Sequence, residues 1–217
     1  MEPVRVVSGT AVPLDRSDVD TDQIIPSDWL KRVERTGFGA GLFSEWREDP
    51  EFVLNRPEHS EASILVTGPN FGTGSSREHA VWALTDYGFK AVVSARFADI
   101  FHTNATKNGL VPARVAPEVA DALLAAVGAE PALELIIDVE HRTVAAPAIG
   151  LVAPFALDDA VRERFLQGLD DIGLSLRHTA AIAAFEATRP EWMPCTTAAP
   201  PRFVSPLHPG SPAPGRP

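Results

Sequence analysis

The chain has 217 residues, of which 45% are hydrophobic and 22% charged, and its net charge at pH 7 is −10. This composition is that of a globular protein with one domain of ordinary size and an appendage. An acidic chain without a basic stripe is not expected to bind nucleic acid, and no apolar run reaches the roughly 18–20 residues that cross a bilayer. The single cysteine, Cys195, excludes an intramolecular disulfide and a multi-thiolate metal site built from this chain alone. The N-terminus lacks the pattern of a signal peptide, and together these features favour a cytoplasmic protein.

The first half of the chain begins with a short strand at 4–13 and an acidic loop at 18–26. A short helix is predicted at 27–31, and residues 34–55 indicate irregular loops with one short helix. The elements predicted next are a strand at 62–67, a helix at 75–87 ended by Gly88, a strand at 90–94, a helix at 96–107 stopped by Asn108-Gly109, and a strand at 110–115. This alternation of strand and helix predicts a parallel or mixed α/β layer.

The second half begins with a helix at 117–127 that starts with proline. Three antiparallel strands and three helices are then predicted: strands at 133–139, 143–146 and 150–154, and helices at 158–168, 170–177 and 179–187, with Asp158 and Asp170 as caps. From residue 190 the composition becomes rich in proline, serine and alanine. We therefore expect a folded domain at 1–193 and a disordered tail at 194–217.

The most informative segment is 71–80, which reads FGTGSSREHA and lies between a β-branched run and an apolar-periodic run. Ser75 and Glu78 fit a capping box at the start of a helix, and the glycines suit a tight turn. A capping box does not explain the doubled serine followed by Arg77, so the segment is either a helix start alone or an anion site for a carboxylate substrate. A P-loop is excluded because no Gly-Lys-Ser/Thr follows, and Arg77 occupies the place of the third glycine of a dinucleotide fingerprint.

The second candidate segment, 18–22, reads DVDTD and resembles the opening of a calcium loop. The glycine and glutamate that complete an EF-hand are replaced by Gln23 and Trp29. A solvated turn with Asx hydrogen bonds is therefore favoured, although the apolar pair Ile24-Ile25 should fix the position of the acids.

Two further features stay open at this level. The basic, glycine-containing segment at 31–39 is either a surface loop or a loop that closes over a ligand. None of the six histidines has a zincin spacing, so we expect no metal bound by this chain. His79 either orients a site group or is a structural histidine.

Three motifs carry a resemblance to a known family: FGTGSSREHA, DVDTDQIIP and LKRVERTGFGAGLF. Together they closely resemble the small subunits of bacterial 3-isopropylmalate dehydratase (isopropylmalate isomerase), which correspond to the swivelling domain of the aconitase superfamily. The resemblance extends from about residue 4 to about residue 192, and the tail lies outside it.

The resemblance implies an α/β fold of the swivelling β/β/α type, with a mixed sheet and flanking helices. It implies a heterodimer or heterotetramer with a large subunit that holds a [4Fe-4S] cluster on three cysteines, and no cofactor bound by this chain. The implied reaction interconverts 2- and 3-isopropylmalate by dehydration and rehydration through 2-isopropylmaleate, in leucine biosynthesis, with a small dicarboxylate as substrate.

By the same resemblance Ser75 is the base, acting as an alkoxide, and Arg77 and Ser76 hold a substrate carboxylate. The implied catalytic residues are Ser75, Arg77 and Asp22, and the implied substrate-binding residues are Ser76, Gly74, Asp20, Thr21, Leu30, Lys31, Arg32 and Val33. The segment 30–38 selects the substrate in related enzymes, and here it holds both apolar and basic residues. Asp18 departs from relatives that have asparagine there, which puts the loop's hydrogen bonding in doubt but not its chemistry. Two alternatives remain: the small subunit of a related hydro-lyase, such as homoaconitase or citraconate/2-methylmalate hydratase, and a non-catalytic anion-binding module of the same fold.

Overall fold

The structure is a computed structural model that describes residues 1–31, 36–190 and 192–193. Contacts between Cα atoms divide the chain into two units, 1–176 and 177–217. The first unit holds every strand and all but the last helix, α7 (Thr179–Ala187), of the described residues. These residues contain no helix that is long and apolar enough to cross a membrane.

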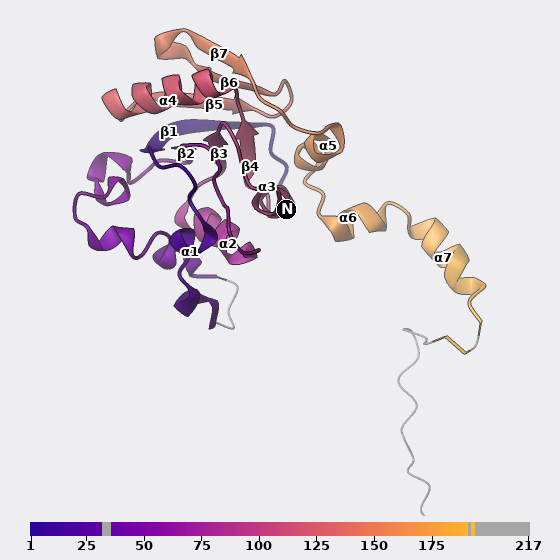
Figure 1. Cartoon of the computed structure of the whole chain (residues 1–217). Helices are drawn as coiled ribbons and strands as arrows, with labels where there is room; N and C mark the ends of the chain where they lie inside the picture. The colour runs from indigo at the N-terminus through magenta and orange to yellow at the C-terminus, as the bar shows by residue number, and fades with distance from the viewer. Residues whose placement is uncertain (32–35, 191, 194–217) are drawn as a thin grey trace, which may run out of the picture. The chain divides into compact units, whose positions relative to one another are not determined.

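A seven-stranded mixed sheet with the order β4-β3-β2-β1-β5-β6-β7 organises the first unit (Figure 1). β1 joins its two halves, because residues 11–14 pair in parallel with β2 and residues 6–10 pair antiparallel with β5. The strands are β1 (Val6–Leu14), β2 (Ile64–Thr67), β3 (Ala91–Ser94), β4 (Val111–Arg114), β5 (Glu134–Asp138), β6 (Thr143–Ala146) and β7 (Leu151–Pro154). The predicted mixed α/β layer and the antiparallel second half are therefore confirmed.

Helices cover both faces of the parallel half, and Figure 1 shows α4 on one side of β1 and β2 and α2 on the other. The alternation of strand side chains explains this arrangement: Val12 and Leu65 belong to one buried cluster, whereas Ala11 and Ile64 belong to the second. The longer helices are α2 (Glu78–Tyr87), α3 (Asp99–Lys107), α4 (Pro117–Ala129) and α5 (Asp159–Gln167), and α6 (Asp171–Leu176) is shorter. As predicted, Asp158 caps α5 by accepting from the N–H of Ala160 at 2.8 Å.

Short 3₁₀ helices lie between β1 and β2, and the first of them is the short helix predicted at 27–31. They are η1 (Ser27–Lys31), η2 (Phe38–Gly41), η3 (Trp46–Glu48), η4 (Val53–Asn55) and η5 (Pro57–His59), and a sixth, η6 (Pro147–Ile149), lies between β6 and β7. The prediction of one short helix over 34–55 was too low, because buried aromatic residues such as Phe38 and Phe43 fix this segment against the core.

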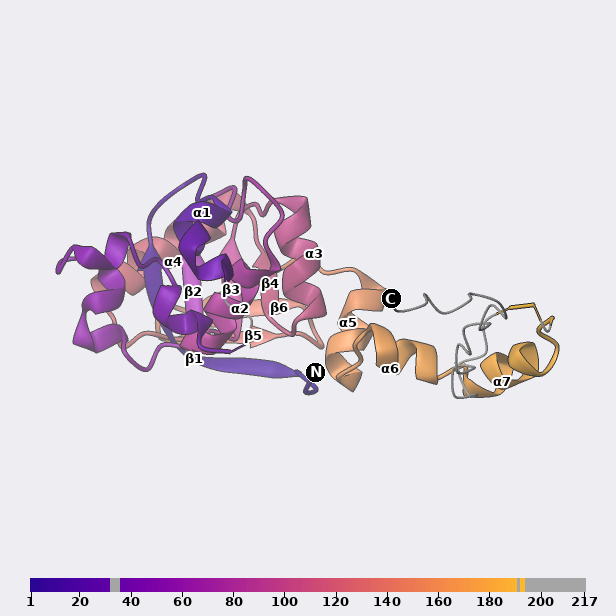
Figure 2. The same ribbon diagram turned by 90° about the horizontal axis from the view of Figure 1, so that it is seen from below.

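One predicted loop and two predicted helix starts were wrong where loops pair with one another. The segment 18–26 is not all loop, because one helical turn, α1 (Thr21–Ile24), forms within it. α2 begins at Glu78 and α3 at Asp99, three residues later than predicted in both cases. The isolated bridges Asp20–Thr73 and Phe71–Phe97 keep the residues before these helices extended. In Figure 2, the loops that follow the parallel strands gather with α1 at one edge of the sheet.

Candidate active site

The two segments singled out in the sequence pair directly with each other at the carboxyl edge of the parallel strands. The N–H groups of Gly72 and Thr73 donate to the carbonyl of Val19 at 2.8 and 3.1 Å, and Thr21 N–H donates to the carbonyl of Thr73 at 2.9 Å. These bonds close a short parallel bridge between Asp20 and Thr73. The acidic loop and the glycine-rich loop therefore form one structural unit, at the edge where open α/β sheets bind ligands.

A capping box fixes the acidic loop in place. The Asp20 side chain accepts from Gln23 N–H at 2.8 Å, and the Gln23 side chain accepts from Asp20 N–H at 2.9 Å. The pattern D-x-x-Q is a helix-start signal that was readable in the sequence and was missed. No group of three or more metal-ligating side chains is found among the described residues.

The capping box predicted at Ser75 and Glu78 does not form. Arg77 is the N-cap of α2, and no side chain caps it. Instead the Ser75 carbonyl accepts a hydrogen bond from Thr21 Oγ1 at 2.9 Å. Thr21 is only 2% exposed, whereas Ser75 and Ser76 are exposed. The backbone of Ser75 is therefore held by the hydroxyl of a buried threonine, while Ser75 itself is exposed to solvent.

Gly74 allows the close approach of the two loops. Its φ is +84°, in the left-handed region, and a Cβ there would lie 3.4 Å from the Cβ of Asp20. Gly72 has φ +79°, and a Cβ there would lie 2.2 Å from the ring of Phe101. Glycine is thus required at position 72 by both conformation and space, and at position 74 mainly by conformation.

The guanidinium of Arg77 is oriented from the acidic loop. Its Nη1 forms an ion pair with Asp22 Oδ1 and also donates to the carbonyl of Ile25 at 3.4 Å. The Arg77 side chain is 16% exposed and that of Asp22 58% exposed, so the pair lies at the surface with the arginine largely covered. Ile24 and Ile25 are fully buried, as predicted, and they fix the position of the acids.

Backbone donors are available next to Ser75. Among the described residues, no acceptor takes the N–H groups of residues 74–79. Free N–H groups at the start of a helix bind anions, because the helix dipole adds to their hydrogen-bonding capacity. The exposed serines, the oriented arginine and these donors are groups of the kind that bind anions.

Within the segment 30–38, only some of the described residues contact the elements that carry the candidate site. Lys31 is exposed and pairs with Asp28 at 2.8 Å, a hydrogen bond that raises the pKa of Lys31 and lowers the pKa of Asp28. Leu30 is half-buried against the core, and Arg32 and Val33 lie outside the described residues. Phe38 is fully buried and contacts the ring of His79 on α2.

His79 packs between aromatic rings. Its ring centroid lies 5.2 Å from that of Phe38 and 4.7 Å from that of Trp82. These contacts favour the structural alternative for His79, and they connect the start of α2 to the segment that follows η1.

The fold and this loop pair define the class of the protein. Residues 1–118 match the family model of the aconitase C-terminal domain, and residues 171–199 match the model of the C-terminal domain of 3-isopropylmalate dehydratase small subunits. A solved structure titled 3-isopropylmalate dehydratase from Methanocaldococcus jannaschii has the same fold, with a TM-score of 0.64 and 24% identity over 83% of this chain and 99% of that one. The molecule is thus a mixed α/β domain of the aconitase C-terminal type.

Relatives give the particular family. The chain is 62% identical to the 3-isopropylmalate dehydratase small subunit of Frankia alni over 89% of this chain and 98% of the relative. It is 58% identical to that of Rubrobacter xylanophilus over 89% and 98%, and 57% identical to that of Streptomyces griseus over 92% and 100%. The chain belongs to the family of 3-isopropylmalate dehydratase small subunits, and it is a subunit of a hydro-lyase.

Proposed function

We propose that this chain supplies the base and one carboxylate-binding group for the interconversion of 2- and 3-isopropylmalate, and that another chain supplies the rest of the active site. One observation carries the proposal: Ser75 is exposed beside Arg77, and both are held by the acidic loop through Thr21 and Asp22. The family membership and the arrangement of these side chains support the same reaction.

In the proposed dehydration, the Ser75 alkoxide takes a proton from the carbon α to a carboxylate. The electron pair of that C–H bond forms the C=C bond of 2-isopropylmaleate, and hydroxide leaves from the neighbouring carbon. Addition of water in the opposite sense gives the isomer, with Ser75 returning its proton. Such a proton is weakly acidic, so both the base and the developing anion need stabilisation.

Hydrogen-bond donors lie close to where the Ser75 alkoxide and the substrate anion would form. The free N–H groups of residues 74–79 lie on both sides of Ser75 and at the start of α2, where the helix dipole favours negative charge. Arg77 binds one substrate carboxylate through its planar guanidinium, with the Ser76 hydroxyl beside it. The N–H of Gly74 is one of these donors.

The acidic loop acts in this proposal by positioning. Asp22 orients the Arg77 guanidinium, and Thr21 holds the Ser75 backbone by its hydroxyl. Asp20 forms the capping box that fixes the positions of Thr21 and Asp22. Thr21 is buried, so its role in the proposal is to hold Ser75 and not to touch the substrate.

We assign the missing part of the site to a large subunit, the partner that the name of the family implies. The implied [4Fe-4S] cluster does not fit this chain, because three thiolates are needed and the chain has one cysteine, which lies outside the described residues. Bound to the partner, the cluster would supply the Lewis acid for the departing hydroxide. The heteromer, with two or four chains, belongs to the proposal, as does a location in the cytosol.

The segment 30–38 is proposed to line the pocket for the substrate's variable group. Leu30 offers apolar surface, while the ammonium of Lys31 pairs with Asp28. The rival substrates, citraconate and homoaconitate, differ from isopropylmalate in this group, so a comparison of their turnover separates the alternatives.

The test is turnover by the chain mixed with an iron–sulfur large subunit under anaerobic conditions. We expect turnover of 2-isopropylmalate in preference to citraconate and homoaconitate, and a loss of at least about 10³-fold in kcat for Ser75→Ala with the complex still assembled. The matched variant Ser76→Ala should act mainly on KM, because it loses a contact present in the ground state. Near-normal turnover by Ser75→Ala would remove Ser75 as the base, and a preference for homoaconitate would favour the related hydro-lyase.

A further inference from the structure

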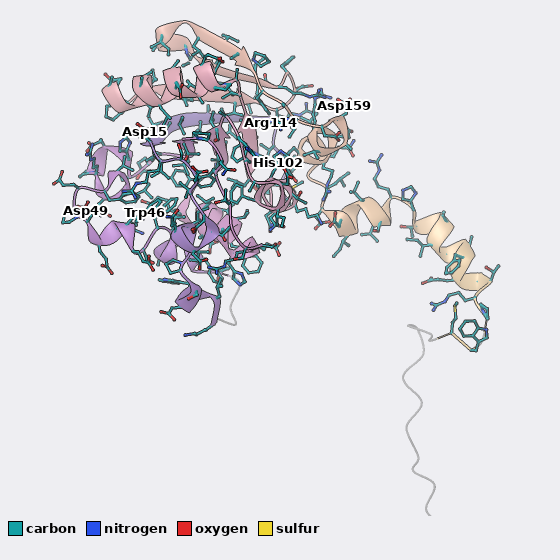
Figure 3. All side chains as sticks on the ribbon, in the orientation of Figure 1. Asp15, Trp46, Asp49, His102, Arg114 and Asp159 are labelled. Carbon is teal, nitrogen blue, oxygen red and sulfur yellow. The ribbon has the colours of Figure 1, made fainter. Side chains whose placement is uncertain are left out.

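A polar cleft lies beside the candidate active site in the first unit. It has a volume of about 580 Å³ and is lined by the start of α3, the end of β4, the β5–β6 turn and the segment after β7. Figure 3 shows His102 of α3 and Arg114 at the end of β4 close together, with Asp159 of α5 nearby. The proposed reaction does not use this cleft.

Two side chains in the cleft, of which Arg114 is exposed and His102 half-buried, form no hydrogen bond or ion pair of their own among the described residues. Arg114 forms no ion pair and the His102 ring no hydrogen bond with any residue in the described part of the chain. Burial lowers the pKa of His102, and the charge of Arg114 lowers it further, against the opposing effect of the Asp99 carboxylate. Arg114 is therefore a cation without an ion pair in the described part of the chain, and it lies beside the half-buried imidazole of His102.

Most carboxylates around the cleft already interact with other groups of the protein. Asp159 forms an ion pair with Arg142, and Asp158 caps α5. Asp99 stands in the first turn of α3, where the helix N-terminus stabilises a carboxylate. A carboxylate from outside is the group that would pair with Arg114 and accept a hydrogen bond from the ring N–H of His102.

The cleft is continuous with the loop that carries Ser75. Phe71 N–H donates to the carbonyl of Arg96 at 3.1 Å, and Ala98 N–H donates to the carbonyl of Phe71 at 3.0 Å. Phe97, which follows Arg96, lines the cleft, and Gly72 lies against Phe101 of α3. A chain that covers Ser75 with an interface of ordinary size, about 800 Å² per partner, would extend over the cleft as well.

We propose that this cleft is part of the surface that docks the large subunit, and that an acidic side chain of that subunit occupies it against Arg114 and His102. The inference rests on the proposed function, because the need for a second chain to complete the site is what brings a partner to this edge. Charge complementarity supports the occupant, since Arg114 lines the cleft without an ion pair among the described residues, while the lining carboxylates of Asp99 and Asp158 stand at the starts of α3 and α5.

The test measures the dissociation constant for the purified large subunit with three forms of the full chain: native, Arg114→Glu and Lys90→Glu. Lys90 is the matched control, because it is an exposed cation without an ion pair among the described residues and precedes β3, at the opposite end of the parallel strands. We expect Arg114→Glu to weaken binding at least about tenfold and Lys90→Glu to leave it within about twofold. At saturating large subunit, kcat of Arg114→Glu should stay within about threefold of native.

Circular dichroism and thermal melting first establish that the variants are folded. Each binding result then supports or overturns the inference. Native affinity of Arg114→Glu for the large subunit overturns the docking inference and leaves the proposed function intact. A loss of kcat at saturation with unchanged affinity also overturns it, because the cleft would then serve the chemistry. Failure of the native chain to bind the large subunit or to turn over substrate with it would overturn the proposed function itself.

Discussion

The hydroxyl of Thr21 is the contact that links the acidic loop to the proposed base. Thr21 and Ser75 are 54 positions apart in the chain, and the hydrogen bond between them is 2.9 Å long. A displacement of about 1 Å at a reacting atom can cost about 10²-fold in rate, so the position of this backbone matters for catalysis. The role of Thr21 is therefore testable by kinetics.

Thr21→Val removes the hydroxyl and keeps the shape of the side chain. We expect kcat to fall about tenfold or more, because Ser75 loses the bond that positions it, while KM changes little. Thr21→Ser keeps the hydroxyl and should retain kcat within about threefold. Steady-state kinetics of the reconstituted enzyme measure both, and equal effects of the two substitutions would contradict the positioning role.

At the scale of elements, the loop after β2 depends on Gly72. Gly72→Ala would place its Cβ against Phe101 and force alanine to adopt φ +79°, so we expect a loss of at least about 2–3 kcal/mol in the free energy of unfolding. Gly150→Ala is the control, because it has φ +66° with nothing within 4 Å, and it should cost only about 1 kcal/mol. Chemical denaturation measures both, and similar losses would show that the contact with Phe101 is unimportant.

The element boundaries show where sequence reasoning stops. The strands, Gly88 as the end of α2 and Asp158 as the cap of α5 follow local patterns, and they were predicted. The starts of α2 and α3 were placed too early because bridges to distant loops hold the preceding residues extended, and no local pattern contains that information. The same holds for the candidate site: the sequence singled out both motifs, but the contacts between them, such as Thr21 with Ser75, have no local signal.

At the scale of the whole molecule, the fold class was predicted from the sequence. That the active site is divided between this chain and a large subunit was inferred. The mixed seven-stranded sheet agrees with the resemblance stated from the motifs. The side of the molecule around Asp15, Trp46 and Asp49, labelled in Figure 3, was not predicted in detail. Arg16 there stacks over Trp46 at 4.1 Å, a tertiary contact without a sequence signature.

The domain boundary remains a proposal at this scale. The sequence predicts a domain at 1–193 and a disordered tail at 194–217, and the tail lies outside the described residues. We expect the chain shortened to 1–193 to melt within about 2 °C of the full chain, because the removed segment has few apolar residues that could pack. Differential scanning calorimetry checks this, and a much lower melting temperature would show that the tail contributes to the fold.

The central claim is that this chain holds half of an active site. Its most direct test is a titration of this chain into a fixed amount of large subunit with its iron–sulfur cluster intact, and 2-isopropylmalate turnover is the readout. We expect no turnover by either chain alone and a rise in turnover that saturates at one small subunit per large subunit. Turnover by this chain alone, or by the large subunit without it, would contradict the claim.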